Sequence, residues 1–285
     1  MADITIVEVG PRDGLQNEKR IVPTIDKLRL IELLTDAGLS RIEVTAFVSP
    51  RWVPQMADHE KVLRNVPQTP RVSHSVLVPN EQGAASALGI GVEEVVIFTS
   101  ASETFAQKNI NCSIAESIER FSPVATLARK YGARLRGYVS CSTECPFEGL
   151  VEPHATTQVV AALNALGCAE VSLADTIGLA SPDQVDAMLE SVTAHFSSEM
   201  LACHFHDTSG QALNNVDVSL DYGIRVFDSS AGGLGGCPYA PGAAGNLKTS
   251  SLVRHLHGKG YSTGISLVAL ERAEEFAQSL CSELV

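Results

Sequence analysis

The chain has 285 residues, and 45% of them are hydrophobic, which is enough to build the core of one large α/β domain. Its 33 acidic and 21 basic residues give a formal net charge of −12, which argues against non-specific binding to nucleic acid or to an anionic membrane. Apolar runs stay well below the about 18 residues that a membrane-spanning helix needs, so we expect no such helix.

The N-terminus and the cysteines both indicate a cytoplasmic protein. A predicted strand begins at Ile4, which leaves no room for a signal or transit peptide. The seven cysteines are odd in number, and no second Cys or His pair is spaced to complete a zinc site with Cys141 and Cys145. We therefore expect reduced thiols, most of them buried as small apolar side chains.

Short β-rich runs alternate with amphipathic helical segments along the chain. In the first helical segment Ile25, Leu28 and Ile31 recur at the spacing of one helix face. The predicted strands are Ile4–Gly10, Arg41–Phe47, Arg71–Val78, Glu94–Thr99, Leu135–Cys141, Glu170–Asp175, Leu201–His206 and Arg225–Ser229. The predicted helices lie near residues 24–38, 58–65, 81–89, 114–131, 155–166, 181–196, 211–222, 247–257 and 266–283.

Eight strands with helices between them predict a TIM (β/α)8 barrel. A doubly wound sheet is the alternative, but the number of strand–helix units and the lack of a glycine-rich phosphate loop after the first strand favour closure. We expect a single catalytic domain over residues 1–285, with 247–285 as an additional C-terminal helical extension.

Residues that could carry chemistry follow the strands, where TIM barrels place their active sites. His204 and His206 are two apart at the end of a strand, so both point to one face and can reach a single metal ion. An isolated His-x-His is as often a pair of hydrogen-bonded residues beside a loop. Arg12 and Asp13 follow the first strand, and Glu43 lies in the second, which adds acidic and basic groups to the same rim.

A second distinctive stretch is the glycine-rich segment from Gly232 to Asn246, which contains Cys237. Its glycines leave little side-chain bulk, so the segment suits a lid that carries a reactive thiol. The alternative is a flexible loop with an incidental cysteine. A phosphate-binding P-loop is excluded because no Gly-Lys-Ser/Thr follows the glycines.

Almost end to end, the chain resembles the 3-hydroxy-3-methylglutaryl-CoA (HMG-CoA) lyases, metal-dependent TIM-barrel enzymes with an Asp-Arg-Glu signature. The shared motifs are Val7-Glu-Val-Gly-Pro-Arg-Asp-Gly-Leu-Gln-Asn-Glu-Lys19, Phe47-Val-Ser-Pro-Arg-Trp-Val-Pro-Gln-Met56, Lys108-Asn-Ile-Asn-Cys-Ser113, Arg136-Gly-Tyr-Val-Ser-Cys141, Asp175-Thr-Ile-Gly178, His204-Phe-His-Asp207 and the segment around Cys237. Together they are far more specific than a likeness of fold.

The resemblance implies a metal site and a set of catalytic groups. Four residues match the family's ligands for a divalent cation, usually Mg2+ or Mn2+: Asp13, His204, His206 and Asn246. The positions expected to be catalytic are Arg12, Asp13, Glu43, Asp175, His204 and Cys237. The positions expected to bind substrate are Arg12, Gln16, Lys19, Asn109 and Tyr138.

In the family's chemistry, Arg12 matches the residue that faces the thioester oxygen, and Glu43 matches an acid that orients Arg12 or the metal shell. Asp175 matches a required acid behind the metal ligands, and Cys237 matches the thiol that handles a proton at the released carbon. The implied reaction is retro-Claisen cleavage of HMG-CoA to acetyl-CoA and acetoacetate, a step of leucine breakdown and ketone-body formation. We expect a homodimer or a higher homo-oligomer.

Two departures from the family pattern bear on these expectations. The family's loop usually begins Ser-Val-Ala-Gly-Leu-Gly-Gly-Cys, whereas this chain has Ser230-Ala-Gly-Gly-Leu-Gly-Gly-Cys237. The added glycine and the lost valine could widen the mouth of the pocket, which leaves the acyl group of the substrate open. Cys281 lies near the C-terminus, but its surroundings differ from those of the regulatory cysteine of animal members.

The nearest alternative is a relative that cleaves another 3-hydroxyacyl-CoA, such as a 3-substituted 3-hydroxyglutaryl-CoA or citramalyl-CoA, or that condenses instead of cleaving. A metal-dependent hydrolase of the amidohydrolase type also uses His-x-His, but on the first strand, whereas the pair here lies on the seventh. A binding barrel without activity is a third alternative. The full set of ligand-type residues argues against it.

Overall fold

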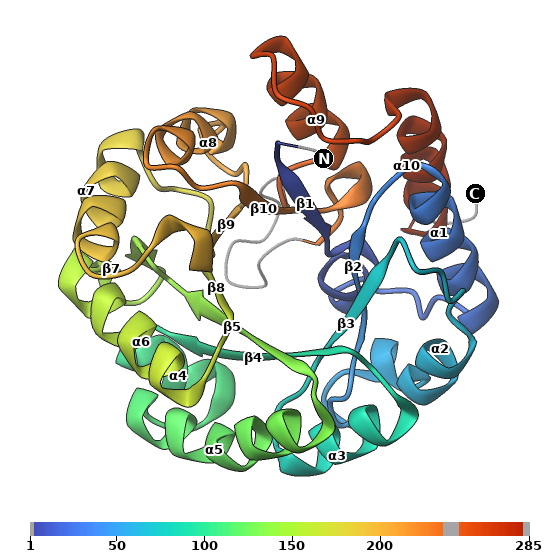
Figure 1. The fold of residues 1–285 in the computed structure, drawn as a ribbon, viewed down its shortest axis with the longest axis horizontal. Coiled ribbons are helices and arrows are strands. Elements are labelled where there is room, and N and C mark those ends of the chain that lie inside the picture. Colours follow the sequence, from blue (N-terminus) through green and yellow to red (C-terminus); the bar gives the residue numbers. More distant parts are fainter. Residues whose placement is uncertain (1–2, 236–244, 282–285) are drawn as a thin grey trace.

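The computed structural model describes residues 3–235 and 245–281. Eight parallel strands form a closed barrel in the order β1-β10-β9-β8-β5-β4-β3-β2, and the helices surround it (Figure 1). The barrel strands are β1 Thr5–Glu8, β2 Arg41–Ala46, β3 Ser73–Leu77, β4 Glu94–Ser100, β5 Arg134–Ser140, β8 Glu170–Asp175, β9 Leu201–Phe205 and β10 Val226–Ser229. This arrangement confirms the predicted TIM barrel.

The helices follow the strands in the order that the sequence predicts. They are α1 Thr24–Asp36, α2 His59–Asn65, α3 Glu81–Ile90, α4 Glu103–Ile110, α5 Ile114–Tyr131, α6 Pro153–Leu166, α7 Pro182–Thr193, α8 Ala212–Asp221, α9 Thr249–Gly258 and α10 Leu267–Cys281. Glycines in the left-handed conformation end several of them, as Gly132 ends α5 at φ +68° and Gly167 ends α6 at φ +99°.

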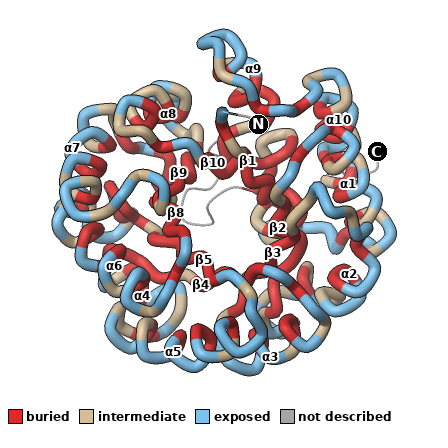
Figure 2. Tube along the Cα trace, viewed as in Figure 1, coloured by how far each residue is buried: buried red, intermediate tan, exposed pale blue. Residues whose placement is uncertain are grey.

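The hydrophobic core lies between the strands and the outer helices, and Figure 2 shows the strands buried and the outer faces of the helices exposed. Alternation along each strand produces this division. On β9, Leu201, Cys203 and Phe205 belong to the hydrophobic core, whereas His204 between them faces the barrel interior with other polar side chains. The interior is therefore available for charged and metal-binding groups.

The two C-terminal helices pack onto the barrel. Helix α10 contacts α1, so it closes the ring of helices between the last and the first strand (Figure 1). Glu8 of β1 connects the first strand to the start of α9. Its Oε1 accepts hydrogen bonds from the backbone N–H groups of Gly10 and Ala231, and its Oε2 accepts one from the Thr249 hydroxyl. Burial raises the pKa of Glu8 to about 7 although these three donors favour the carboxylate.

Several short elements are not predicted from the sequence. Residues 10–14 form one π-helical turn, η1 (Gly10–Gly14), so the first strand ends two residues before the predicted Gly10. The sequence pattern predicts no helix at α4. Only Phe105 and Ala106 of its eight residues are buried, so the apolar residues show little helical periodicity. A two-stranded hairpin, β6 (Glu144–Cys145) and β7 (Gly149–Leu150), follows β5.

The six cysteines that the structure describes are free thiols, as expected; Cys237 lies outside the described residues. Among the helices of the described chain, none is both long and apolar enough to cross a membrane.

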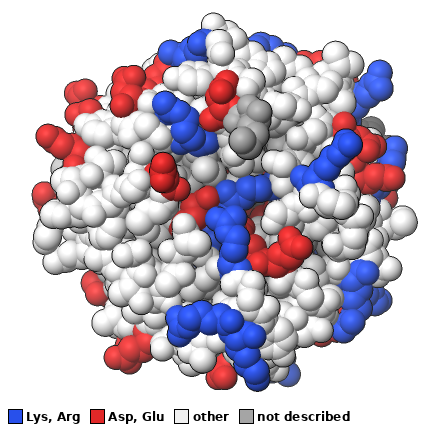
Figure 3. Space-filling view, viewed as in Figure 1, with Lys and Arg blue, Asp and Glu red and all other residues white. Residues whose placement is uncertain are grey.

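Charged side chains fill the N-terminal end of the barrel interior. Arg41, the first residue of β2, donates to both oxygens of Glu170 at 2.8 and 3.0 Å and lies 3.3 Å from Glu94. These two acids begin β8 and β4, so the three residues form one layer across the barrel, which we call the basal layer. Acidic and basic atoms meet at the centre of the face shown in Figure 3.

Candidate metal centre and active site

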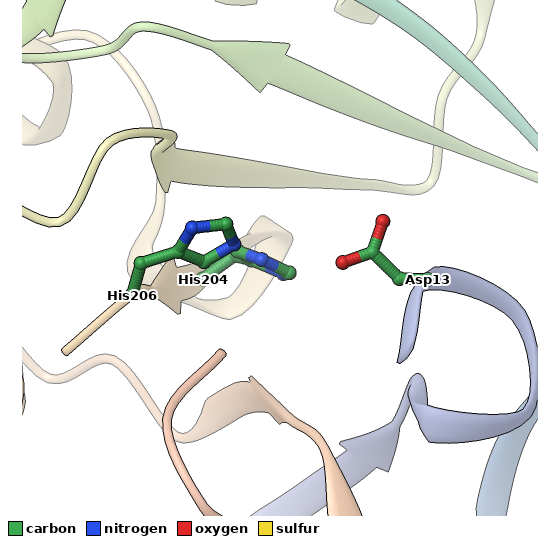
Figure 4. Close-up of side chains that lie close together, drawn as sticks. All are labelled: Asp13, His204 and His206. Atoms are coloured by element: carbon green, nitrogen blue, oxygen red, sulfur yellow. The ribbon is translucent and has the colours of Figure 1, made fainter. Parts of the chain in front are cut away.

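Three side chains with metal-binding atoms converge at the C-terminal end of the barrel. Asp13 lies on η1, His204 lies on β9, and His206 directly follows that strand. One carboxylate oxygen and one nitrogen from each ring all lie within 4.8 Å of one another. Figure 4 shows the two imidazole rings together, facing Asp13 across a short gap. The structure thus brings together three of the four predicted ligands.

The backbone explains how residues so far apart in sequence meet. Strand β1 pairs with β10, and β10 pairs with β9, so the turn after β1 lies close to the end of β9. The π-helical turn of η1 bends the chain over the barrel, where the N–H groups of Arg12 and Gly14 both donate to the Val9 carbonyl. Single π-helical turns are often found at functional sites.

Asn246, the fourth predicted ligand, is held beside the other three. It forms a backbone bridge with His206, and its Nδ2 donates to Asp13 Oδ2 at 2.7 Å and to the Leu234 carbonyl at 3.0 Å. The backbone packs tightly here, because a Cβ on Gly245 would lie 2.3 Å from the carbonyl oxygen of Gly235. With both amide hydrogens directed at the protein, the Oδ1 of Asn246 is left to accept or to ligate.

Three buried polar atoms of this cluster have no hydrogen-bond partner among the described residues. They are the Nδ1 atoms of His204 and His206 and the Oδ1 of Asn246; of these, the Nδ1 of His204 faces the Asp228 carboxylate at 3.4 Å. Leaving a buried polar atom unpaired costs about 1–3 kcal/mol, so such atoms are rarely grouped without a ligand that completes them. Two imidazoles, one carboxylate and one amide oxygen form a donor set that Mg2+ or Mn2+ accepts. The residues present therefore fit a divalent cation.

The charge states of the cluster also suit a cation. Burial alone would raise the pKa of Asp13, but the positive charge of Arg12 beside it outweighs burial and lowers the pKa. Burial lowers the pKa of His206 to about 4. At neutral pH the site therefore offers an ionised carboxylate and a neutral imidazole, the forms that bind metal ions.

Arg12 lies beside the proposed ligands and is itself buried. Its Nη1 donates to Asp13 Oδ1 at 2.6 Å, and its Nε contacts Glu43 Oε1. Burial opposes the charge on this guanidinium, but the nearby carboxylates raise its pKa above the ordinary value. The structure thus pairs Glu43 with Arg12, one of the two roles expected for that acid. A fixed cation beside the ligands can stabilise a developing oxyanion.

Tyr138 on β5 was expected to bind substrate. Its hydroxyl donates a hydrogen bond to Glu43 Oε2 at 3.0 Å and accepts one from Arg136 Nη1 at 2.8 Å. In this structure the hydroxyl is therefore bonded to other protein side chains. Its ring meets His204 edge to face, with the centroids 6.0 Å apart. Tyr138 therefore lies between the Arg12 side and the His204 side of the cluster.

Asp175 holds a loop and has no hydrogen bond to the cluster. Its two oxygens accept from the N–H groups of Gly178 and Ala180, and burial raises its pKa to about 6. Gly178 is essential to this packing, because a Cβ there would lie 2.9 Å from the His206 carbonyl carbon. Asp175 thus supports the backbone of His206 through the β8–α7 loop.

The remaining predicted residues lie outside the cluster. Gln16 is half-buried after η1, Lys19 is exposed, and Asn109 is exposed near the end of α4. In the described part of the chain, no hydrogen bond or ion pair joins these three to the proposed ligands. Cys237 falls in residues 236–244, outside the described residues.

Two buried residues beside the site were not among the predicted functional residues. Asp228 lies on β10, 3.4 Å from His204, and Arg136 on β5 donates to Asp228 at 2.7 Å. Arg136 could have been noticed from its strand, because Arg134, Arg136 and Tyr138 alternate along one face of an otherwise apolar run. A charged residue in the middle of a central strand needs a buried partner.

Comparison with known proteins shows the family of this chain. The profile of the HMGL-like family matches residues 3–277, nearly the whole chain. The chain belongs to the HMGL-like family. Among curated HMGL-like relatives, the cytoplasmic HMG-CoA lyase of Danio rerio is 51% identical over 273 residues, which cover 96% of this chain and 82% of the relative. The mitochondrial hydroxymethylglutaryl-CoA lyase of Bos taurus is also 51% identical, over 96% of this chain and 84% of its own.

Solved structures of HMGL-like proteins superpose closely. The HMG-CoA lyase of Brucella melitensis is 53% identical, has a TM-score of 0.96, and is covered over 99% of both chains. An HMG-CoA lyase of Acinetobacter baumannii, solved in complex with coenzyme A and 3-methylmalate, is 37% identical with a TM-score of 0.92, over 98% of this chain and 91% of that chain.

Proposed function

We propose that this protein is a carbon–carbon lyase that cleaves HMG-CoA to acetyl-CoA and acetoacetate with the help of a bound Mg2+ or Mn2+. The observation that carries the proposal is the convergence of Asp13, His204 and His206, whose candidate ligand atoms lie within 4.8 Å of one another, beside the buried Asn246 Oδ1, which has no hydrogen-bond partner among the described residues. HMG-CoA lyases related over nearly the whole chain support the same substrate.

The reaction breaks one carbon–carbon bond. The tertiary hydroxyl of the substrate loses its proton, and the oxygen's electron pair forms the ketone of acetoacetate. The electrons of the broken bond pass to the carbon next to the thioester, which gives the enolate of acetyl-CoA, and a proton then completes the new methyl group. When bound, a divalent cation supplies positive charge for the hydroxyl oxygen and for the ketone that it becomes.

The residues of the site divide this work between them. We assign removal of the hydroxyl proton to Asp13 and His204, whose carboxylate oxygen and ring nitrogen lie within 4.8 Å of each other. Arg12 is held by Glu43 and Asp13 and faces the growing charge of the enolate oxygen. Cys237 is proposed to return the proton to the enolate carbon, as the resemblance implies.

The glycine-rich segment departs from the family pattern at residues 231–232, so the identity of the substrate's acyl group is the least determined part of the proposal. The relative from A. baumannii was solved with 3-methylmalate and coenzyme A, so one HMGL-like protein holds an acid other than HMG. A related 3-hydroxyacyl-CoA, such as a 3-substituted 3-hydroxyglutaryl-CoA or citramalyl-CoA, is therefore the alternative substrate. Gln16, Lys19 and Asn109 are proposed to bind the thioester, as the resemblance implies.

A panel of 3-hydroxyacyl-CoA thioesters tests the proposal. We expect HMG-CoA to give the highest kcat/KM, with activity lost in chelator and restored by added Mg2+ or Mn2+. Full activity in chelator would contradict the metal role. A higher kcat/KM for another thioester would establish the alternative substrate, and no cleavage of any would contradict a lyase of this class.

Two further properties are proposals of the same kind. We propose a cytoplasmic protein with reduced thiols, which the six free cysteines support; the relatives include both cytoplasmic and mitochondrial enzymes. We also propose a homodimer or higher homo-oligomer, which light scattering would test.

A further inference from the structure

Arg136 occupies the centre of the barrel interior and uses every guanidinium nitrogen. Its Nε donates to Glu170 Oε1 at 2.6 Å, its Nη1 donates to the Tyr138 hydroxyl at 2.8 Å, and its Nη2 donates to Asp228 Oδ1 at 2.7 Å. The side chain is fully buried. Hydrogen bonds in three directions fix the planar guanidinium in one position. The groups bonded to it, Glu170, Tyr138 and Asp228, are therefore held in place as well.

One branch leads from Arg136 to the metal centre. Asp228 and His204 are register partners on the neighbouring strands β10 and β9. Asp228 Oδ2 lies 3.4 Å from His204 Nδ1 and also accepts from the Ser172 hydroxyl at 2.8 Å. Asp228 therefore connects Arg136, through Oδ1, to the imidazole of His204, which its Oδ2 faces.

The other branch leads to Arg12. The Tyr138 hydroxyl, which accepts from Arg136, donates to Glu43 Oε2 at 3.0 Å, and Glu43 Oε1 contacts Arg12 Nε. Glu43 is fully buried. A continuous buried chain thus runs from Arg12 through Glu43, Tyr138, Arg136 and Asp228 to His204.

We propose that Asp228 is a positioning residue for His204, and that Arg136 fixes Asp228 and the Tyr138–Glu43–Arg12 branch together. The inference rests on the proposed metal centre. With Nδ1 turned to Asp228, the imidazole presents Nε2 to the space beside Asp13. A carboxylate behind a ligating histidine holds the ring and makes it a better donor. The ligand and the enolate-facing arginine are thereby set by one buried residue.

A purely structural ion network is the contrasting interpretation, and the basal layer is an example of one. Glu170 accepts from both Arg41 and Arg136 there, and neither Arg41 nor Glu170 has an ion pair with a proposed ligand. Asp228 and Glu43 differ, because each turns one oxygen to the network and the other to a residue of the site, His204 or Arg12.

Asp228→Asn tests the first branch, because it keeps the shape of the side chain and removes the charge. We expect the Mn2+ affinity, measured by electron spin resonance, to fall about 10–100-fold. Asp217→Asn is the matched control: Asp217 also pairs with a histidine, His255 at 2.7 Å, but on the outer helices α8 and α9. It should leave the affinity unchanged. Thermal unfolding of each variant sets a temperature at which all are folded.

His206→Ala separates failure of this inference from failure of the metal centre. If His206→Ala loses Mn2+ and Asp228→Asn binds it like the wild type, the positioning role is overturned and the metal centre stands. If both variants bind Mn2+ like the wild type, the metal centre itself is wrong. A loss in Asp217→Asn equal to that in Asp228→Asn would also overturn the positioning role.

Tyr138→Phe tests the second branch, because it removes only the hydroxyl between Arg136 and Glu43. We expect kcat to fall while KM for HMG-CoA changes little, since Arg12 acts as charge develops; a rise confined to KM would overturn this branch.

The double variant Tyr138→Phe with Asp228→Asn tests the joint role of Arg136. If one residue sets both branches, the double variant loses less kcat than the product of the two single losses. Independent, multiplicative losses would overturn the joint role.

Discussion

Two layers of polar side chains share the interior of this barrel, and they are completed in different ways. In the basal layer, Arg41 has carboxylate partners in Glu94 and Glu170. In the upper layer, which contains Asp13, His204, His206 and Asn246, the Asn246 Oδ1 and the His206 Nδ1 are buried without a hydrogen-bond partner among the described residues. The polar atoms of the basal layer are paired within the protein, whereas the proposed cation would complete the upper layer.

Glu8 shows a third arrangement. It is buried like the basal acids, but its hydrogen-bond partners are two backbone N–H groups and the Thr249 hydroxyl. Its pKa rises to about 7, whereas the pKa of Glu170, which has two arginine partners, is lowered despite burial. At Glu170 the two arginines outweigh burial, whereas the three donors to Glu8 do not. The comparison predicts different consequences for each layer.

The largest expected effect follows from removing the central cation of the basal layer. Arg41→Met leaves Glu94 and Glu170 with fewer cationic partners, so we expect the free energy of unfolding to fall by about 3–5 kcal/mol. Urea unfolding measures this fall. Mn2+ affinity of the folded variant should stay at the wild-type value, because Arg41 contacts none of the proposed ligands.

Arg29→Met is the matched control for Arg41→Met. Arg29 pairs with Glu32 on the surface, where both side chains are about half exposed, so the loss should stay below about 1 kcal/mol. Equal losses in the two variants, or loss of Mn2+ binding in Arg41→Met, would contradict the division into independent layers.

Cys237→Ala asks whether proton return is separate from metal binding. If the thiol protonates the enolate carbon, kcat should fall by about 10²–10⁴-fold, the usual contribution of one acid–base group. Mn2+ affinity should persist, because the upper-layer ligands are unchanged. Wild-type turnover would remove Cys237 from the mechanism, and lost Mn2+ binding would mean that it serves the upper layer instead.

Glu8→Gln tests the acid without a cationic partner. Because the pKa of Glu8 rises from 4.5 in the unfolded chain to about 7, unfolding releases a proton between these values. The wild type therefore loses stability as pH rises through this window, on the order of 3 kcal/mol by about pH 8. Gln keeps an oxygen for the two N–H groups and can donate to Thr249, so the variant should lack this loss.

The measurement for Glu8→Gln is the difference in unfolding free energy between variant and wild type from pH 4 to pH 8, which cancels other titrating groups. Glu32→Gln at the surface is the control and should show a nearly constant difference. A constant difference for Glu8→Gln as well would show that this carboxyl is ionised throughout and that its three donors outweigh burial.

His206→Ala removes one proposed metal ligand of the upper layer. A residue behind a ligand is worth about 10–100-fold in metal affinity, so loss of the ligand itself should cost at least about 100-fold. Calorimetry or electron spin resonance with Mn2+ measures this loss. The protein should stay folded, since the His206 Nδ1 has no partner to lose. Near-normal affinity would remove His206 from the ligand set.

Much of this architecture could be predicted from the sequence. All eight barrel strands have their own apolar runs and turn residues, so alternation and glycines predict them and their order. The pairing of His204 with His206 follows from strand alternation alone. Helix α4 could not be predicted in the same way, because it buries only two residues.

What the sequence could not predict depends on register. That Asp228 lies beside His204 requires the alignment of β10 on β9, and a shift by one residue would turn Asp228 to the other face. Asn246 joins the ligands through a bridge to His206 that follows from the path of the chain between barrel and helices. The family resemblance predicts the ligand role of Asn246, whereas the residues next to it in the sequence give no sign of that role.

The smallest expected effect concerns Arg12, where the upper layer meets the buried chain from Arg136. Its guanidinium contacts Glu43 through Nε and Asp13 through Nη1, and a lysine has one nitrogen for both. Arg12→Lys keeps the positive charge but loses the fixed fork. We therefore expect kcat for HMG-CoA to fall about 10–100-fold, less than the loss of a whole oxyanion donor. KM should change little, because the contact strengthens only as charge moves onto the thioester oxygen.

Arg12→Met provides the matched comparison, since it removes the charge as well and should lower kcat further than Arg12→Lys. Mn2+ affinity in Arg12→Lys should stay close to the wild-type value, because Asp13 keeps a neighbouring cation and the other ligands are untouched. An effect confined to KM would instead make Arg12 a residue that binds coenzyme A in the ground state. Loss of Mn2+ affinity in Arg12→Lys would show that the arginine's main task is to hold Asp13 in place, and the enolate role would then pass to another donor.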